Sequence, residues 1–320
     1  MASRTGFVHQ GMRYGSDAEF LAGTVGFVRD GLAAGDAVLA VAAARNISLL
    51  REALEPAQAA AVEFVDAADW YGYPARTLGR YHAYCTARSR GGRRRVRVVG
   101  EPVWHGRSPL ETREWKRYES LLNVAFAHTP HWIVCPYDAR ELPGEVLDAA
   151  GHTHPELVVA DGSAAHDERS VAYADPGAFY LRCQTEALAP LGAPDAELAF
   201  TADELSALRG AAAGFVRRAG LSAVRSREVA CAVHECADNA LRHGSGPRAL
   251  RLWAGREFVV CEVVDGGTGA SAAPPGFPGH LPPDPSAPSG HGLWLVRQLS
   301  DLVEERIAAE GSAVRLYFAR

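Results

Sequence analysis

The sequence predicts two α/β domains in tandem, each with its own architecture. The length of 320 residues suits two domains of ~150 residues each. Strand-like and helix-like segments alternate in the first half, which predicts a parallel sheet with helices on both faces. The second half opens with two long helices and continues mainly in strands, which predicts a two-layer α/β sandwich.

In the first half, the expected strands are short apolar runs rich in β-branched residues. They cover residues 37–43, 61–65, 95–99 and 132–135, and helices are expected over 47–54, 77–87 and 111–126, the first of them capped by Asn46. From about residue 160 to 194, Gly, Asp, Ala and Pro dominate. This composition indicates a connector with a short helix near 177–183.

In the second half, helices are expected over 202–219 and 226–243. Thr201 is the expected N-cap of the first helix, with Glu204 three residues later completing a capping box. Strands should follow over 249–253 and 257–264, then a helix over 292–301 and a hairpin from 303–307 and 313–318. The predicted boundaries are therefore 1–160 for the first domain, 161–195 for the connector and 196–320 for the second domain.

Composition excludes several classes of protein. The net charge of −5 argues against direct binding to nucleic acid, which usually needs a basic surface. No apolar run approaches the ~20 residues of a transmembrane helix, and no secretory signal is recognisable at the start. The six cysteines form no CxxC pair and are expected to be reduced core residues. We therefore expect a cytoplasmic protein with no membrane contact.

Lys116 is the only lysine in the chain, and it lies outside any glycine-rich loop. A P-loop requires a lysine that reaches the phosphates, and so does a eukaryotic-type protein kinase. Any nucleotide chemistry in this protein must therefore proceed without lysine.

A first polar cluster, His234-Glu-Cys-Ala-Asp-Asn239, lies late in the second long helix. Glu235 and Asn239 are four residues apart and so project from one helical face. An amide oxygen suits Mg²⁺ beside phosphate oxygens, and a carboxylate one turn earlier can accept a hydroxyl proton. A solvated polar face explains the same pattern, and both interpretations remain open at this point.

Two glycine-rich clusters follow. In Val263-Val-Asp-Gly-Gly-Thr-Gly269 an apolar strand ends in Asp265, whose carboxylate can accept from an adenine amino group while the glycines admit a base. Taken alone, this segment is better explained as a hairpin turn. In Ser289-Gly-His-Gly-Leu293 two glycines open a helix, where free N–H groups favour an anion, although this pattern also marks an ordinary helix start.

Together, in this order and spacing, the three clusters resemble the N box, Asp-x-Gly-x-Gly box and Gly-x-Gly-Leu box of the GHKL ATPases. The resemblance covers about residues 200–320, and the compact domain is most similar to the anti-sigma regulatory factors, which are serine-protein kinases. It implies ATP and Mg²⁺ as cofactors. The residues it implies are Glu235 as general base, Asn239 as Mg²⁺ ligand, Asp265 as adenine reader, Gly267 and Gly269 at the base, and Gly290, Gly292 and Leu293 at the phosphates.

Two features qualify this resemblance. Trp294 stands where many GHKL proteins have a third glycine. His234 lies inside the N-box helix, whereas the phospho-acceptor of histidine kinases lies on a separate upstream helix, so a histidine kinase is not expected.

Residues 273–289 hold seven prolines between the last two boxes, which predicts an irregular lid over the nucleotide.

The first half resembles the MEDS sensory domains over about residues 7–155, on segments that include His9 to Tyr14 and Phe27 to Asp36. These domains look like a recombinase-type ATPase core without its P-loop, and the resemblance implies sensing of a small molecule. Glu101 and Asp138 follow predicted strands, where open α/β sheets bind ligands. With Trp104 and Tyr137 they are the candidates for a sensory pocket. Alternatively, both acids cap helices and pair with Arg107 or Arg117.

His152 and His154 offer two metal ligands, but no third ligand has a recognisable spacing, so the sequence favours no metal site there.

The expected function is that of an anti-sigma regulatory factor controlled by its sensory domain. It would phosphorylate a serine of an anti-anti-sigma partner, as a serine/threonine-protein kinase, or sequester a sigma factor. The alternative is a non-catalytic, ATP-responsive binding module. The sequence names neither partner nor sensed ligand, and a homodimer is possible.

Overall fold

The computed structural model describes residues 6–89, 91, 94–161, 164–184, 188–267, 277–283, 290–308 and 311–320, with the side chains of residues 183 and 184 left out. The chain forms two compact units, Met1–Phe179 and Tyr180–Arg320, called here the first and the second unit. Each unit is described by itself.

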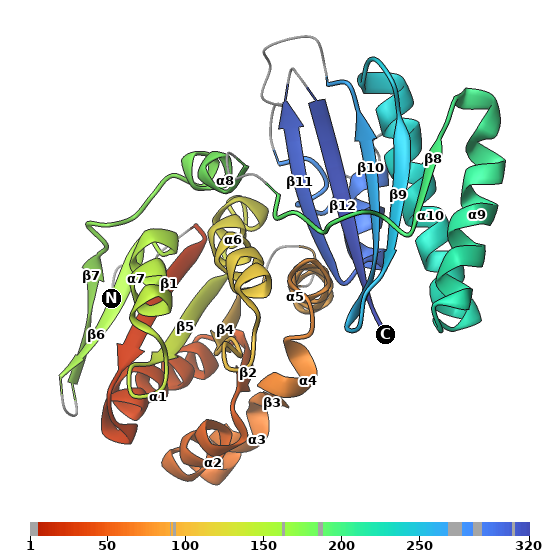
Figure 1. The fold of residues 1–320 in the computed structure, drawn as a ribbon. Helices are drawn as coiled ribbons and strands as arrows, with labels where there is room; N and C mark the ends of the chain where they lie inside the picture. Colours follow the sequence, from red (N-terminus) through yellow and green to blue (C-terminus); the bar gives the residue numbers. More distant parts are fainter. Residues whose placement is uncertain are drawn as a thin grey trace. The chain divides into compact units, whose positions relative to one another are not determined.

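The described residues of the first unit form a seven-stranded sheet in the order β3-β2-β4-β5-β1-β6-β7 (Figure 1). Neighbouring strands run parallel except at the β6–β7 edge, which is antiparallel. The strands are β1 Val8–Tyr14, β2 Ala37–Ala42, β3 Glu63–Asp66, β4 Val96–Gly100, β5 Trp132–Asp138, β6 Glu156–Asp161 and β7 Ala164–Arg169.

Helices cover both faces of this sheet. The helices are α1 Asp17–Ala33, α2 Ala44–Ala53, α3 Pro56–Ala61, α4 Ala67–Trp70, α5 Pro74–Arg88, α6 Pro109–Ala125 and α7 Gly144–Thr153. Side chains of α1 and α2 share an apolar core with one face of β1, β2, β4 and β5. Helices α5, α6 and α7 lie on the other face (Figure 1). Aromatic side chains pack against one another on that face. The predicted doubly covered parallel sheet is confirmed.

The first unit differs from expectation in several details, among them β1, β6, α1 and α7, which lie where no strand or helix was predicted. Asn46 does not cap α2: the helix begins after Ala43, and Asn46 is buried, where its amide donates to Tyr14 Oη and to Glu101. The strand β7 lies inside the stretch interpreted as a connector. Its residues are exposed, so an edge strand like this one has no apolar face that a sequence pattern could reveal.

The described residues of the second unit form a five-stranded antiparallel sheet in the order β11-β12-β10-β9-β8. Its strands are β8 Ala196–Ala199, β9 Ala249–Ala254, β10 Phe258–Asp265, β11 Leu302–Ala308 and β12 Gly311–Ala319. Side chains alternate along β10, so that Val259, Cys261 and Val263 join the apolar core while Glu262 points to the opposite face.

The helices α9 Leu205–Arg218, α10 Ala223–His243 and α11 Gly292–Leu299 pack on the core face of this sheet (Figure 1). A short helix, α8 Pro176–Gln184, spans the boundary between the units, and a 3₁₀ turn, η1 Ala202–Glu204, precedes α9. The predicted capping box is confirmed, because the Glu204 carboxylate accepts hydrogen bonds from the backbone N–H and the hydroxyl of Thr201. The predicted two-layer α/β sandwich is also confirmed.

Among the described residues, no helix combines the length and the apolar character that crossing a membrane requires. Cys85, Cys135, Cys236 and Cys261 are buried thiols, as expected, whereas Cys231 is exposed on α10. The expectation of core cysteines is therefore wrong for Cys231, which faces away from the sheet. The side chain of Cys183 lies outside the described part of the chain.

Candidate functional site

Helix α10 carries the first motif and sets the direction of its side chains. The helix begins at Ser222, whose hydroxyl accepts from the N–H of Arg225. Its apolar stripe, which includes Val229, Val233 and Cys236, packs on the sheet. Glu235 and Asn239 lie one turn apart beside this stripe, and both are half-buried. They therefore remain accessible to a ligand while the helix itself is held by the core.

The first and third motifs meet directly. Gly292 begins α11, and a Cβ atom built on it would lie 2.5 Å from Oε2 of Glu235. Real Cβ atoms do not approach an oxygen so closely, so a side chain at this position would displace the carboxylate. Glycine at position 292 therefore lets the Glu235 carboxylate lie against the start of the helix.

The second motif is hydrogen-bonded to the loop that follows α10. Oδ1 of Asp265, at the end of β10, accepts from the N–H of Gly267 at 2.7 Å. The N–H of Gly266 donates to Ser245 O at 2.7 Å, and the N–H of Ser245 donates to Gly267 O at 2.8 Å. A Cβ atom on Gly244 would lie 2.6 Å from Cγ of Asp265. The three motifs thus meet around the C-terminal half of α10.

Two of the motif glycines have a backbone conformation that other residues rarely adopt. Gly267 has φ of +93° and Gly290 has φ of +94°. No atom lies within 4 Å of a Cβ built on Gly290, among the residues that the structure describes. Gly269 and most of the proline-rich stretch lie outside the described residues, so the predicted lid is seen only at 277–283.

The described lid residues pack on α11 and on α8. A Cβ atom on Gly279 would lie 2.5 Å from Cβ of Leu293, one of the predicted phosphate-site residues. Tyr180, on α8, makes edge contacts with Phe277 and His280, with ring centroids 5.3 Å and 5.1 Å apart. The lid segment is thus held between the start of α11 and the helix that opens the second unit.

A buried glutamate connects these elements to the sheet. Glu305, on β11, accepts a hydrogen bond from Tyr180 Oη and one from Arg297 Nη2 of α11 at 2.6 Å. Neither Tyr180 nor Glu305 stood out in the sequence. Tyr180 lies in the stretch interpreted as a connector, and Glu305 is one of two adjacent glutamates in a predicted strand.

In the first unit, Glu101 forms a structural network rather than an ion pair with arginine. Its carboxylate accepts from Tyr14 Oη at 2.7 Å, from the Ala43 N–H at 2.8 Å and from Asn46 Nδ2 at 2.8 Å. Burial, followed by the charge of Glu101, raises the pKa of Tyr14. The hydroxyl therefore stays protonated and donates to the carboxylate.

Asp138 is paired with Arg140 at 2.6 Å, and this hydrogen bond lowers the pKa of Asp138. The expected partners Arg107 and Arg117 are wrong for both acids, because Arg107 donates to backbone carbonyls and Arg117 pairs with Glu114. Sequence reasoning missed Arg140 because it considered distant arginines only.

The four sensory candidates occupy two faces of the sheet. Tyr137 is buried on the face under α6 and α7, with the Trp104 ring centroid 6.0 Å from its own. Side chains alternate along β5, so Asp138 points to the opposite face from Tyr137. Trp104 and Tyr137 come together, as do Glu101 and Tyr14, but the four do not line one common site.

A cluster that the sequence did not predict lies beside Tyr137. His154 is buried with its ring centroid 4.1 Å from that of His9, and both Nε2 atoms lie near the Glu119 carboxylate. Burial and then His154 lower the pKa of His9 to about 4. Half-buried His152, two residues before His154, takes no part in this cluster: its Nδ1 lies 2.9 Å from the Asp148 carbonyl oxygen.

An antiparallel sheet covered on one face by α9–α11, with three motifs meeting at α10, defines the class of the second unit as a two-layer α/β sandwich. The family model of the histidine kinase-like ATPase domain matches residues 198–318. The model of the MEDS domain, described as the methanogen/methylotroph, DcmR sensory domain, matches residues 8–155. Residues 8–155 are therefore similar to a MEDS domain and residues 198–318 to a histidine kinase-like ATPase domain, and the latter similarity implies ATP as a ligand.

Among solved structures, the chain is similar to the RsbU and RsbW domains of Rv1364c from Mycobacterium tuberculosis. The identity is 17%, the TM-score is 0.28, and the match covers 39% of this chain and 33% of that chain. The match thus spans about a third of that chain's length, and a similarity of this degree bears on neither fold nor function. No curated protein matches the chain.

Proposed function

We propose that the chain is an anti-sigma regulatory factor. Its second domain would bind ATP with Mg²⁺ and phosphorylate a serine of an anti-anti-sigma protein, or sequester a sigma factor. The observation that supports this most strongly is the contact between Glu235 and Gly292, which brings the candidate base against the helix start proposed to hold the phosphates. The MEDS domain, residues 1–160, would control this activity through a connector, residues 161–195.

The positions around α10 fit ATP and Mg²⁺. A Cβ atom at Gly292 would fill the space beside Glu235, and at Gly290 the backbone is open and left-handed, so N–H groups there can approach phosphate oxygens. We assign Gly290, Gly292 and Leu293 to the phosphates, Asn239 to the Mg²⁺ ion, and Asp265, Gly267 and Gly269 to the adenine base.

The proposed chemistry rests on the position of Glu235. Half-buried on the face that Asn239 shares, its carboxylate would accept the proton of the attacking serine hydroxyl. Mg²⁺ would neutralise charge on the phosphates, and this chain would supply no lysine for that purpose. Glu101, Asp138 and the pair of Trp104 and Tyr137 remain separate candidates for a small-molecule response.

The test begins with a pull-down of the tagged full-length chain from its native host, with bound proteins identified by mass spectrometry. Recovered partners are then incubated with radiolabelled ATP and the chain. Serine phosphorylation of a partner supports the kinase. ATP-dependent binding without phosphorylation supports instead a non-catalytic binding module.

Two variants separate these outcomes. Glu235→Ala should keep ATP affinity and lose phosphate transfer by ~10²–10⁴ in rate, the usual contribution of a general base. Asp238→Ala is the matched control, because Asp238 lies on the same helix and pairs only at the surface with Arg242, at 2.7 Å. Normal transfer by Glu235→Ala would show that Glu235 is a polar surface residue.

A further inference from the structure

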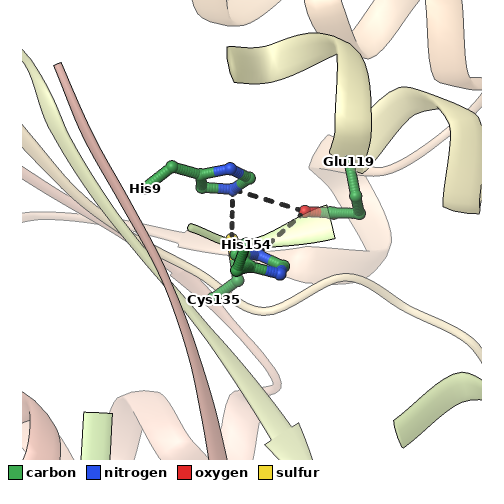
Figure 2. Close-up of side chains that lie close together, drawn as sticks. All are labelled: His9, Glu119, Cys135 and His154. Carbon is green, nitrogen blue, oxygen red and sulfur yellow. Dashed lines mark hydrogen bonds and ion pairs between the residues drawn. The ribbon is translucent and has the colours of Figure 1, made fainter. Parts of the chain in front are cut away.

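Four side chains of the types that bind metals meet inside the first unit. They are His9 on β1, Glu119 on α6, Cys135 on β5 and His154, which ends α7. All four are buried, and one ligand atom from each lies within 4.8 Å of every other (Figure 2). They come from four separate elements, so only the folded domain brings them together.

Three separations between ligand atoms are close to the edges of a metal-centred tetrahedron. Nε2 of His9 and Nε2 of His154 lie 3.6 Å and 3.5 Å from Oε2 of Glu119. Sγ of Cys135 lies 3.5 Å from Nε2 of His9. Zinc bonds of about 2.0–2.3 Å at tetrahedral angles separate the ligand atoms by about 3.3–3.8 Å. These three contacts therefore suit a zinc ion at the centre.

Both imidazoles are oriented by oxygen acceptors at Nδ1. Oδ1 of Asn123 lies 3.1 Å from Nδ1 of His9, and the Asn123 amide nitrogen donates to the carbonyls of Ser120 and Thr153, which fixes the amide orientation. The Ala150 carbonyl lies 2.8 Å from Nδ1 of His154. A carbonyl oxygen only accepts, so Nδ1 of each ring carries the hydrogen and Nε2 presents its lone pair to the cluster.

Three atoms at the centre of the cluster lack hydrogen bonds. Among the described residues, both carboxylate oxygens of Glu119 and Nε2 of His154 are buried and have no hydrogen-bond partner. A buried carboxylate without donors is costly. Pairing with a protonated histidine would bring nitrogen and oxygen to about 2.7–2.9 Å, shorter than the separations seen. A cation between the ligands satisfies all of these atoms at once.

We propose that His9, Glu119, Cys135 and His154 bind one Zn²⁺ ion. Four protein ligands close the coordination shell, which is the arrangement of structural rather than catalytic zinc. The ion would tie α6 and α7 to strands β1 and β5. Gly11 supports the site, because a Cβ atom there would lie 3.2 Å from the His154 ring. This inference is independent of the function proposed for the second domain.

The first test is metal analysis of the full-length chain purified without chelators. We expect about one zinc per chain, lost in His154→Ala and kept in His152→Ala, the matched control at a half-buried histidine two residues earlier on α7. In the same way, Cys135→Ala should lose the metal, and Cys85→Ala, at another buried cysteine of this unit, should keep it. Absence of zinc from the wild-type chain, or equal zinc in His154→Ala and His152→Ala, overturns the proposal.

A second test needs no ligand variant and so does not depend on whether one folds. X-ray absorption at the zinc edge of the wild-type chain should show one sulfur at about 2.3 Å and nitrogen or oxygen atoms at about 2.0–2.1 Å. Asn123→Ala, which leaves all four ligands in place, should weaken zinc binding about 10- to 100-fold in a chelator competition. A spectrum without sulfur overturns the assignment, as does unchanged affinity in Asn123→Ala.

Discussion

The carboxylate of Glu235 lies so close to Gly292 that a Cβ atom on the glycine would come within 2.5 Å of Oε2. This contact joins the middle of α10 to the first residue of α11. The two residues belong to separate motifs, and the contact makes the geometry of each depend on the other.

Gly292→Ala tests this contact. The added methyl group must push the Glu235 carboxylate away, and because this is the far end of a flexible, half-buried side chain, stability should fall by less than about 1 kcal/mol. Phosphate transfer should slow because the displaced carboxylate no longer lies against the start of α11, while ATP should bind within about fivefold of wild type by calorimetry. Gly210→Ala is the control, since Gly210 is exposed within α9 with open space around it. It should leave affinity unchanged and gain about 0.5–1 kcal/mol of stability.

Asp265→Asn tests the proposed adenine contact. A hydrogen bond to an ionised acceptor contributes about 1.5–3 kcal/mol, so ATP affinity should fall about ten- to a hundredfold. The fold should persist, because an amide oxygen can still accept from the N–H of Gly267. Calorimetry and circular dichroism measure the two effects. Unchanged affinity would mean that this segment is only a turn.

Asn239→Ala should remove the part of ATP affinity that depends on Mg²⁺. The amide oxygen would no longer hold the ion beside the phosphates, so the ATP affinities measured with Mg²⁺ and with EDTA should become equal. Asn239→Asp keeps an oxygen ligand and should retain the difference. If Mg²⁺ still raises the ATP affinity of the alanine variant, residues other than Asn239 bind the ion.

Hydrogen exchange tests the lid and the phosphate site. Lids order when a ligand supplies contacts, and phosphates would engage the N–H groups at the start of α11. ATP with Mg²⁺ should therefore slow exchange over residues 290–296 more than in the first domain, and ADP should do so less. Identical hydrogen exchange with and without saturating ATP would mean that the proline-rich segment is a linker and not a lid.

Tyr180→Phe tests the buried contact between α8 and β11. Removing the hydroxyl leaves the Glu305 carboxylate, which also holds Arg297, with one donor fewer. The local opening free energy of β11, measured by native-state hydrogen exchange, should fall by about 1–3 kcal/mol. Tyr84→Phe removes a hydroxyl that donates to the exposed Glu63 and should leave β11 unchanged. An equal effect of the two variants would contradict the role of Tyr180.

The sequence by itself determined the features that depend on neighbours along the chain. Helical spacing placed Glu235 and Asn239 on one face of α10, and Thr201 with Glu204 marked a helix start. The single lysine excluded a P-loop without any structure. Local steric and hydrogen-bonding preferences act over a few residues, which is why these predictions need no tertiary information.

Only the tertiary structure decided which distant residues meet. The sequence predicts Asn46 as a helix cap, but in the folded domain its side-chain amide donates to Glu101 and Tyr14. The cluster of His9 and His154 with Glu119 and Cys135 draws on four elements, and no spacing along the chain encodes it. Strand order and helix packing set these contacts through burial of apolar surface over the whole domain, a property that no short segment carries.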